Sequence, residues 1–82
     1  NPFNTATVIH FELQRPMHIQ LSVFNIQGQC ARRLIDWYMD RGCHQFAWDG
    51  TSNDGTVLAS GVYFCRLVNL DETGTAKLLL VR

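Results

Sequence analysis

The stretch FAWDGTSNDGTVLASGVYFCRL, residues Phe46 to Leu67, decides the fold of this chain. It holds two apolar runs, 46–48 and 62–67, separated by the turn pairs Asp49-Gly50 and Asp54-Gly55. Such pairs form tight turns because glycine accepts a positive φ and aspartate hydrogen-bonds the backbone that follows it. In the second run Tyr63, Cys65 and Leu67 alternate with Val62, Phe64 and Arg66. A period of two residues is typical of a strand whose two faces differ. Two strands with large aromatics on either side of a polar loop therefore predict the centre of a small β-sheet domain.

The same alternation extends outward along the chain. Thr7–Leu13 and His18–Asn25 alternate cleanly, and Cys30–Tyr38 alternates except at the adjacent Leu34 and Ile35, where we expect a β-bulge. The other predicted strands are His44–Trp48, a brief edge segment Val57–Ala59, Val62–Leu70 and Thr75–Val81. About seven strands with turn signals roughly every 8–12 residues predict an all-β, immunoglobulin-like antiparallel β-sandwich without a helix.

We expect the inward positions of these strands to share one core. Tyr63 lies two residues before the inward Cys65, a spacing that resembles the tyrosine corner of such sandwiches. Trp48 and Tyr63 are the expected largest contributors, each burying on the order of 150–250 Å². The predicted core residues are Ile9, Phe11, Leu21, Val23, Phe46, Trp48, Tyr63, Cys65 and Leu67.

Length and composition narrow the class of protein. The 82 residues suit one domain, 1–82, and 46% hydrophobic with 17% charged residues is typical of a globular chain. Seven basic and seven acidic residues cancel, so no general field attracts nucleic acid or an anionic membrane. The longest apolar run, Leu78 to Val81, is too short for a membrane-spanning segment. Because the chain opens Asn1-Pro2-Phe3 without an initiator methionine, we expect a piece of a longer protein.

The three cysteines leave at least one thiol unpaired. Cys30 and Cys43 are expected at opposite ends of a hairpin, beyond the roughly 7 Å Cα limit for a disulfide. Cys65 is expected to point inward as a small core residue. We therefore expect free thiols.

The sequence offers no set of residues typical of catalysis. His10, His18 and His44 fall on different predicted strands, and the first two lie on outward faces. No serine or cysteine stands in a nucleophile context, and no carboxylate pair is bracketed by apolar sequence. We expect a protein that is not an enzyme and that uses no cofactor.

Metal binding is expected to be absent as well. Asp49, Asn53 and Asp54 place oxygen-bearing side chains in one loop, which makes them a weak calcium candidate. Their spacing is not that of a dedicated calcium loop, so plain turn chemistry is favoured. Cys43 and His44 are neighbours on a strand and face opposite ways, which excludes joint ligation of zinc.

Trp37 and Tyr38 cluster where a predicted strand runs into its turn. An exposed aromatic pair at the end of a sandwich is able to contact a partner or stack on a sugar. The favoured alternative is that one ring caps the open end of the core and the other lies along the surface.

Six segments in order along the chain carry a resemblance to a known family. They are 1–4, Ile9–Phe11, Phe24–Gln29, Gly42–Gly50, Leu58–Phe64, and Lys77 followed by 78–82. With these segments the whole chain resembles the C-terminal sorting domain of the type IX secretion system, a signature shared with the Ig-like domain of the flagellar hook-capping protein. Two features depart from the pattern: Thr5 replaces a usual second proline, and the cysteines are unusual.

The resemblance implies a non-catalytic signal. Such a domain directs a secreted parent protein through the periplasm to the cell surface, with the outer-membrane translocon as its partner. The last strand would then carry recognition, because an edge strand offers unpaired backbone groups; its residues are Lys77, Leu78, Leu79, Leu80, Val81 and Arg82. The alternative is a structural or adhesive module that binds neighbouring domains or assembles with itself, as in a hook cap.

Overall fold

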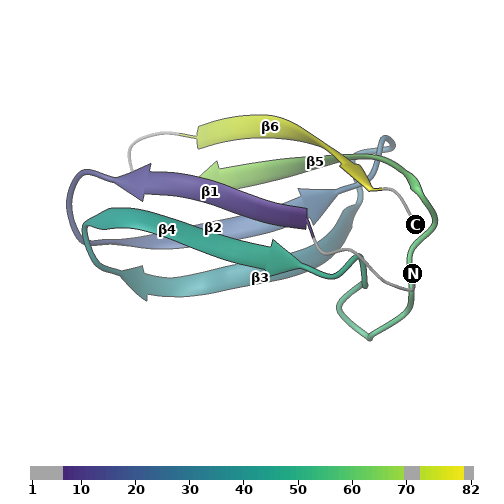
Figure 1. The fold of residues 1–82 in the computed structure, drawn as a ribbon, viewed down its shortest axis with the longest axis horizontal. Coiled ribbons are helices and arrows are strands. Elements are labelled where there is room, and N and C mark those ends of the chain that lie inside the picture. Colours follow the sequence, from purple (N-terminus) through teal and green to yellow (C-terminus); the bar gives the residue numbers. More distant parts are fainter. Residues whose placement is uncertain (1–6, 70–72, 81–82) are drawn as a thin grey trace.

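The computed structural model describes residues 7–69 and 73–80, and within these ranges the chain forms strands without a helix. The strands are β1 (Thr7–Leu13), β2 (Met17–Phe24), β3 (Cys30–Met39), β4 (Gly42–Trp48), β5 (Gly61–Val68) and β6 (Thr73–Leu80). β1 pairs with β4 in one antiparallel sheet, and a second antiparallel sheet has the order β3-β2-β5-β6. Figure 1 shows these as two layers, with β1 and β4 in front of the other strands. Within the described ranges, no helix has the length and apolar character needed to span a membrane.

The predicted edge segment Val57–Ala59 does not form a strand. Only Val57 makes a β-bridge, to Thr51. The loop instead folds on itself, because Ser52 N donates to Thr56 O at 2.9 Å and Leu58 N donates to Gly50 O at 3.0 Å. The described residues therefore contain six strands, and the expected number of about seven is not confirmed.

The predicted bulge in the third strand is confirmed. In the β2–β3 ladder Leu21 pairs with Ile35 and Ser22 pairs with Arg33, so Leu34 has no partner in the register. The extra residue lets Leu34 and Ile35 both reach the core, at 7% and 0% exposure, although they are adjacent in the sequence. A second register shift between Val23 and Phe24 skips Ala31.

The core joins residues from both sheets. Of the residues predicted there, Ile9, Leu21, Val23, Trp48, Tyr63 and Cys65 are buried. They cluster with four further buried residues, Leu13, Ile19, Leu34 and Ile35. Cys65 is a free thiol, as are the exposed Cys30 and Cys43, and burial raises the pKa of the Cys65 thiol to about 11.

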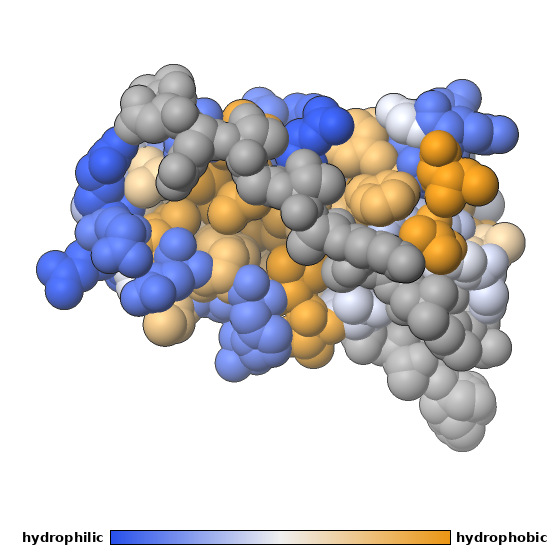
Figure 2. Space-filling model, turned by 90° about the horizontal axis from the view of Figure 1, so that it is seen from above, coloured by the Kyte–Doolittle hydropathy of each residue, from blue (hydrophilic) through white to orange (hydrophobic). Residues whose placement is uncertain are grey.

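Three residues expected in the core are only half-buried. Phe11, Phe46 and Leu67 pack against the core cluster but are not enclosed by it. Among the described strands both β1 and β4 are sheet edges, so Phe11 and Phe46 have a neighbouring strand on one side only. Leu67 lies on the wider sheet, which two strands do not cover completely. Figure 2 shows apolar residues gathered along one of these sides, with hydrophilic residues around them.

Ser22 also departs from expectation, because the simple alternation places it on the outward face. It is buried, with 5% exposure, between two buried neighbours, Leu21 and Val23. Its partners in the register are Arg33 on β3 and Arg66 on β5. Two long side chains on neighbouring strands are therefore available to cover this small residue.

Trp48 and Tyr63 link the two sheets at the centre of the core. Their rings meet edge to face, with centroids 5.3 Å apart at 73°. The Trp48 indole donates to Thr51 O at 3.0 Å, and the Tyr63 hydroxyl donates to Ala59 O at 2.8 Å. The second bond, to a backbone carbonyl four residues upstream, is the geometry of a tyrosine corner and agrees with the expectation for Tyr63.

Candidate interaction surfaces

The loop 49–56 uses its acidic oxygens for its own turns. Asp49 Oδ1 accepts from Thr51 N at 3.1 Å and from Thr51 Oγ1 at 2.7 Å. Asp54 Oδ1 accepts from Thr56 N at 3.0 Å and from the Ser52 hydroxyl. The bond from Thr51 lowers the pKa of Asp49, and the bonds from Ser52 and Thr56 lower the pKa of Asp54 to about 2. These carboxylates therefore act as acceptors within the turn.

The calcium candidate residues use their side-chain oxygens for hydrogen bonds within the loop and to β3. Asn53 Oδ1, the third candidate ligand, accepts from the backbone of Arg33 at 2.8 Å instead. In the ranges 7–69 and 73–80 no group of three His, Cys, Asp or Glu is placed to hold a metal ion.

The same loop covers one end of the β3 edge. Asn53 N donates to Ala31 O at 3.2 Å, while its side chain accepts from Arg33 N, so one residue satisfies two backbone groups of the edge strand. The Arg32 guanidinium donates to Thr51 Oγ1 at 2.7 Å and to Ser52 O at 2.9 Å. Uncovered edge strands favour unwanted pairing with other chains, and this contact blocks the part of β3 next to the loop.

Asn53→Ala is expected to release this cover. Backbone hydrogen exchange, followed by NMR, should show the Arg33 amide exchanging faster in the variant because it loses its acceptor. A loss of one such hydrogen bond costs about 0.5–1.5 kcal/mol. Val57→Ala, in the same loop with an exposed side chain, is the control and should leave the Arg33 amide unchanged. Equal exchange rates in the two variants would show that Asn53 does not protect the edge.

Trp37 and Tyr38 are both exposed, at 49% and 65%. The Trp37 ring tilts against Phe46 of β4, with centroids 6.4 Å apart. Trp37 therefore covers part of the gap between the β3 and β4 edges, which fits the capping interpretation for that ring. Tyr38 pairs in the register with His18 and remains the more accessible of the two.

The three histidines have different surroundings. His44 stacks on Phe11, with centroids 5.4 Å apart, and its Nε2 lies 2.8 Å from Asp40 O. His10 is exposed on β1. A shallow hollow of about 370 Å³ crosses β1 and β4 and includes both histidines and Cys43. His18 is engaged elsewhere, on the four-stranded sheet.

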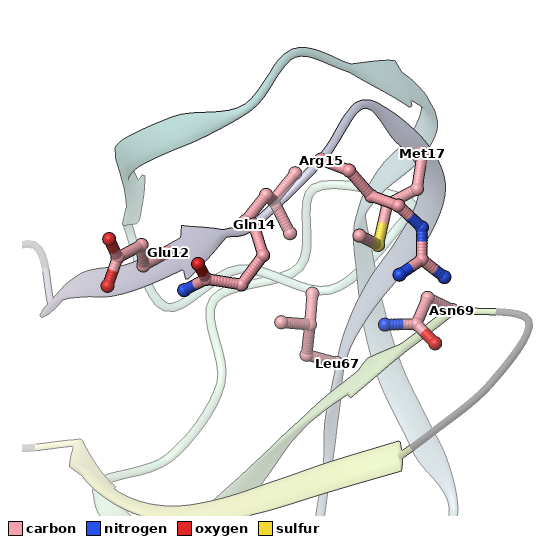
Figure 3. A pocket seen from close by; sticks show the side chains of 7 residues that line it. Glu12, Gln14, Arg15, Met17, Leu67 and Asn69 are labelled. Atoms are coloured by element: carbon pink, nitrogen blue, oxygen red, sulfur yellow. The ribbon is translucent and has the colours of Figure 1, made fainter.

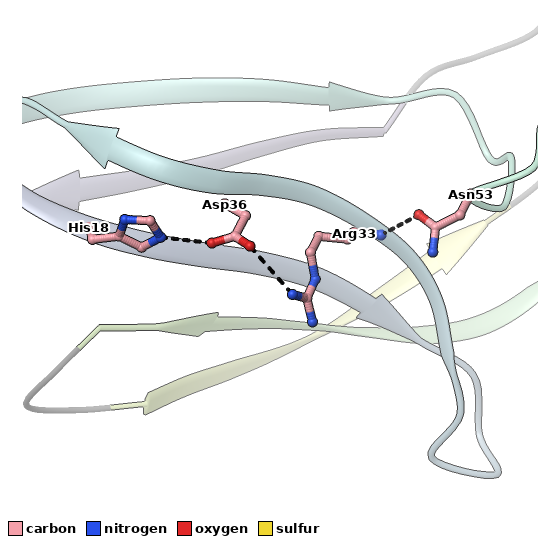
Figure 4. Close-up of polar contacts among 4 residues, drawn as sticks. All are labelled: His18, Arg33, Asp36 and Asn53. Carbon is pink, nitrogen blue, oxygen red and sulfur yellow. Dashed lines mark hydrogen bonds and ion pairs between the residues drawn. The ribbon is translucent and has the colours of Figure 1, made fainter.

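A polar network crosses the outer side of the β2–β3 pair, as Figure 4 shows. His18 Nε2 lies 2.7 Å from Asp36 Oδ1, and Arg33 Nη1 lies 3.5 Å from Asp36 Oδ2. The contact with His18 lowers the pKa of Asp36, and the charge of Arg33 acts in the same direction. All three groups are solvent-exposed, so the network adds little stability.

The strand predicted for recognition lies at an edge of the four-stranded sheet. β6 pairs with β5 alone among the described strands. In the register Lys77 pairs with Phe64, Leu78 with Tyr63, Leu79 with Val62 and Leu80 with Gly61. Val81 and Arg82, the last two residues of that prediction, lie outside the described residues.

A hollow of about 210 Å³ lies at the end of the molecule where β1 turns into β2, and Figure 3 shows it. Its lining includes the apolar Leu13, Met17 and Leu67 and two residues of opposite charge, Glu12 and Arg15. No pattern in the sequence pointed to this hollow. Its residues belong to the half-covered flank of the core.

Another surface missed by the sequence analysis lies on the outer side of β2 and β5. Phe24, Ile26, Phe64 and Arg66 line a hollow of about 230 Å³ together with Asn25 and Gly28. A signal was present in the sequence, since Phe64 and Arg66 alternate with the inward Tyr63 and Cys65 and so face away from the core. We call Phe24, Ile26, Phe64 and Arg66 together the Phe24–Arg66 surface.

The two antiparallel sheets and the tyrosine corner are typical of a small all-β domain of the Ig-like class. The family model of the FlgD Ig-like domain matches residues 3–72. The chain therefore belongs to the FlgD Ig-like domain family. A search of curated proteins found no match. The narrower resemblance to type IX sorting domains stays a prediction.

Proposed function

We propose that this domain is a non-catalytic structural module that mediates protein–protein assembly, as a hook-cap Ig-like domain would. The observation that carries the proposal is the match of residues 3–72 to the FlgD Ig-like domain. The β-sandwich architecture expected from the sequence is part of the same proposal, and the two antiparallel sheets support it.

The surface chemistry supports an assembly role. Large apolar side chains are exposed at several places, namely Val8, Ile26, Trp37, Tyr38 and Val57. Single exposed apolar residues are ordinary on a protein surface, but exposed aromatics on rigid strands are suited to protein contacts. Because Trp48 and Tyr63 fix the sheets from within, such contacts are presented without the cost of ordering a flexible segment.

Light scattering on the purified chain over a range of concentrations tests this role. An assembly module that contacts its own kind is expected to give a defined dimer or an ordered oligomer whose mass rises with concentration. A strict monomer that also carries a fused reporter to the cell surface would contradict the proposal and favour sorting.

A second candidate is the sorting function, with a secreted or cell-surface localisation and the translocon as partner. The position of β6 at a sheet edge favours it, because an edge strand is able to accept a strand from a partner. Fusing residues 1–82 to a reporter in a host with type IX secretion tests this candidate. A reporter that stays in the periplasm removes it.

A further inference from the structure

The turn beside the Phe24–Arg66 surface is held by several hydrogen bonds that converge on Asn25. Asn25 Oδ1 accepts from Gln27 N at 2.9 Å and from Gln29 N at 3.0 Å. The backbone of Asn25 also bonds Gly28 and Gln29, each at 3.0 Å. Gly28 has a φ of 83°, which a side chain would disfavour. Ile26 is therefore held in solvent, 73% exposed, at the tip of a constrained turn.

The apolar part of this surface is suited to a partner side chain. Phe24 and Phe64 are direct neighbours in the β2–β5 register, and both are half-buried. With Ile26 they border the hollow of about 230 Å³. An apolar side chain placed there would remove three apolar groups from water at once.

The charged part of the surface is positive and is not neutralised locally. The Arg66 guanidinium lies over the Phe24 ring, 4.5 Å from its centroid. This cation–π contact needs no hydrogen-bond acceptor, so it does not use up the N–H donors of the guanidinium. Arg66 forms no ion pair with a carboxylate in ranges 7–69 and 73–80, and none of the lining residues is acidic.

Among the described side chains nearby, Arg66 is the charge that no carboxylate balances. Arg33 and Arg66 are paired with the same residue, Ser22, on opposite sides of β2. Arg33 contacts Asp36, which His18 also contacts, so the Arg33–Asp36 pair adds no net charge to this face.

Resting on the assembly function proposed above, we propose that the Phe24–Arg66 surface binds an acidic, apolar-containing segment of a partner protein. A carboxylate of the segment accepts hydrogen bonds from Arg66, and an adjacent apolar side chain enters the hollow between Ile26 and the two phenyl rings. Charge complementarity selects the acidic segment, and the fixed turn lowers the ordering cost of binding.

NMR on ¹⁵N-labelled chain with capped pentapeptides tests this inference. The probe is Glu-Leu-Glu-Leu-Glu, and the comparison peptides are Gln-Leu-Gln-Leu-Gln and Glu-Ser-Glu-Ser-Glu. The probe is expected to shift the backbone amides of 24–28 and 64–66, and raising the salt concentration should weaken its binding. Each comparison peptide should bind about tenfold more weakly, since it lacks either the charge or the apolar group.

Variants show whether the named side chains carry the binding. Arg66→Gln and Ile26→Ser should each weaken binding of the probe about tenfold, while Arg41→Gln, at an exposed position in the β3–β4 turn, should leave it unchanged. Equal binding of the three peptides, shifts centred on Trp37 and Tyr38, or an unchanged affinity of Arg66→Gln would each overturn the inference. Light scattering of the chain without peptide tests the assembly function separately. The assembly proposal and the peptide-binding proposal can therefore fail independently.

Discussion

Trp48→Ala is expected to unfold the domain at room temperature or leave it barely folded. Trp48 is 1% exposed, meets Tyr63 edge to face and hydrogen-bonds Thr51 O through its indole. Truncating a buried tryptophan costs about 3–5 kcal/mol. A domain of this size has a free energy of unfolding on the order of 5 kcal/mol, so the loss consumes most of it. Urea unfolding followed by circular dichroism measures the effect.

Trp37→Ala is the matched control for this prediction. Trp37 is half exposed and touches Phe46 at the flank of the core. Its loss should lower the free energy of unfolding by only about 1 kcal/mol, the worth of an aromatic pair. Similar losses in the two variants would contradict the assignment of Trp48 to the interior and Trp37 to the flank.

The second large effect concerns the bulge of β3. Leu34→Ala and Ile35→Ala are each expected to lower the free energy of unfolding by about 2–5 kcal/mol. In a regular strand two adjacent residues face opposite sides, and only one of them would be costly to truncate. Both are costly here because the register skips Leu34 and both side chains are buried.

Arg33→Ala and Asp36→Ala, on either side of the pair, serve as controls. Both residues are exposed, and their ion pair is a surface contact, so each change should cost less than about 1 kcal/mol. A large loss at only one of Leu34 and Ile35 would mean that the strand is regular and the bulge absent.

The direction of most side chains could be predicted from the sequence. Strict alternation was enough to place Ile9, Leu21, Val23, Trp48 and Tyr63 inward, because a strand has only two faces. The adjacent Leu34 and Ile35 were also enough to predict a bulge. Local patterns carry this information, and the structure agrees with them at these positions.

The degree of burial could not be predicted in the same way. Phe11, Phe46 and Leu67 pack against the core but are half-buried, since their cover depends on which strands lie beside and opposite them. Val57–Ala59 has the composition of a strand, yet its backbone already pairs with the loop before it, through the Thr51–Val57 bridge and the bond from Leu58 N to Gly50 O. Both outcomes depend on residues distant along the chain.

The candidate surfaces could likewise be predicted only in part from the sequence. The exposure of Ile26 and the contact of Arg66 with the Phe24 ring follow from how the turn at Gly28 meets β5, which no local pattern shows. From the sequence, the loop 49–56 contained candidate oxygen ligands for calcium. In the structure these oxygens accept hydrogen bonds from the turn and, at Asn53, from the edge strand β3.

The most direct test of the two-sheet arrangement is acrylamide quenching of tryptophan fluorescence in two single-tryptophan variants. Trp37→Phe leaves Trp48 as the reporter, and Trp48→Phe leaves Trp37. If β1 and β4 close over the four-stranded sheet, Trp48 emits at shorter wavelength and is quenched far more slowly than Trp37. Equal quenching of the two, or faster quenching of Trp48, would contradict the buried centre on which the assembly proposal and its exposed surfaces rest.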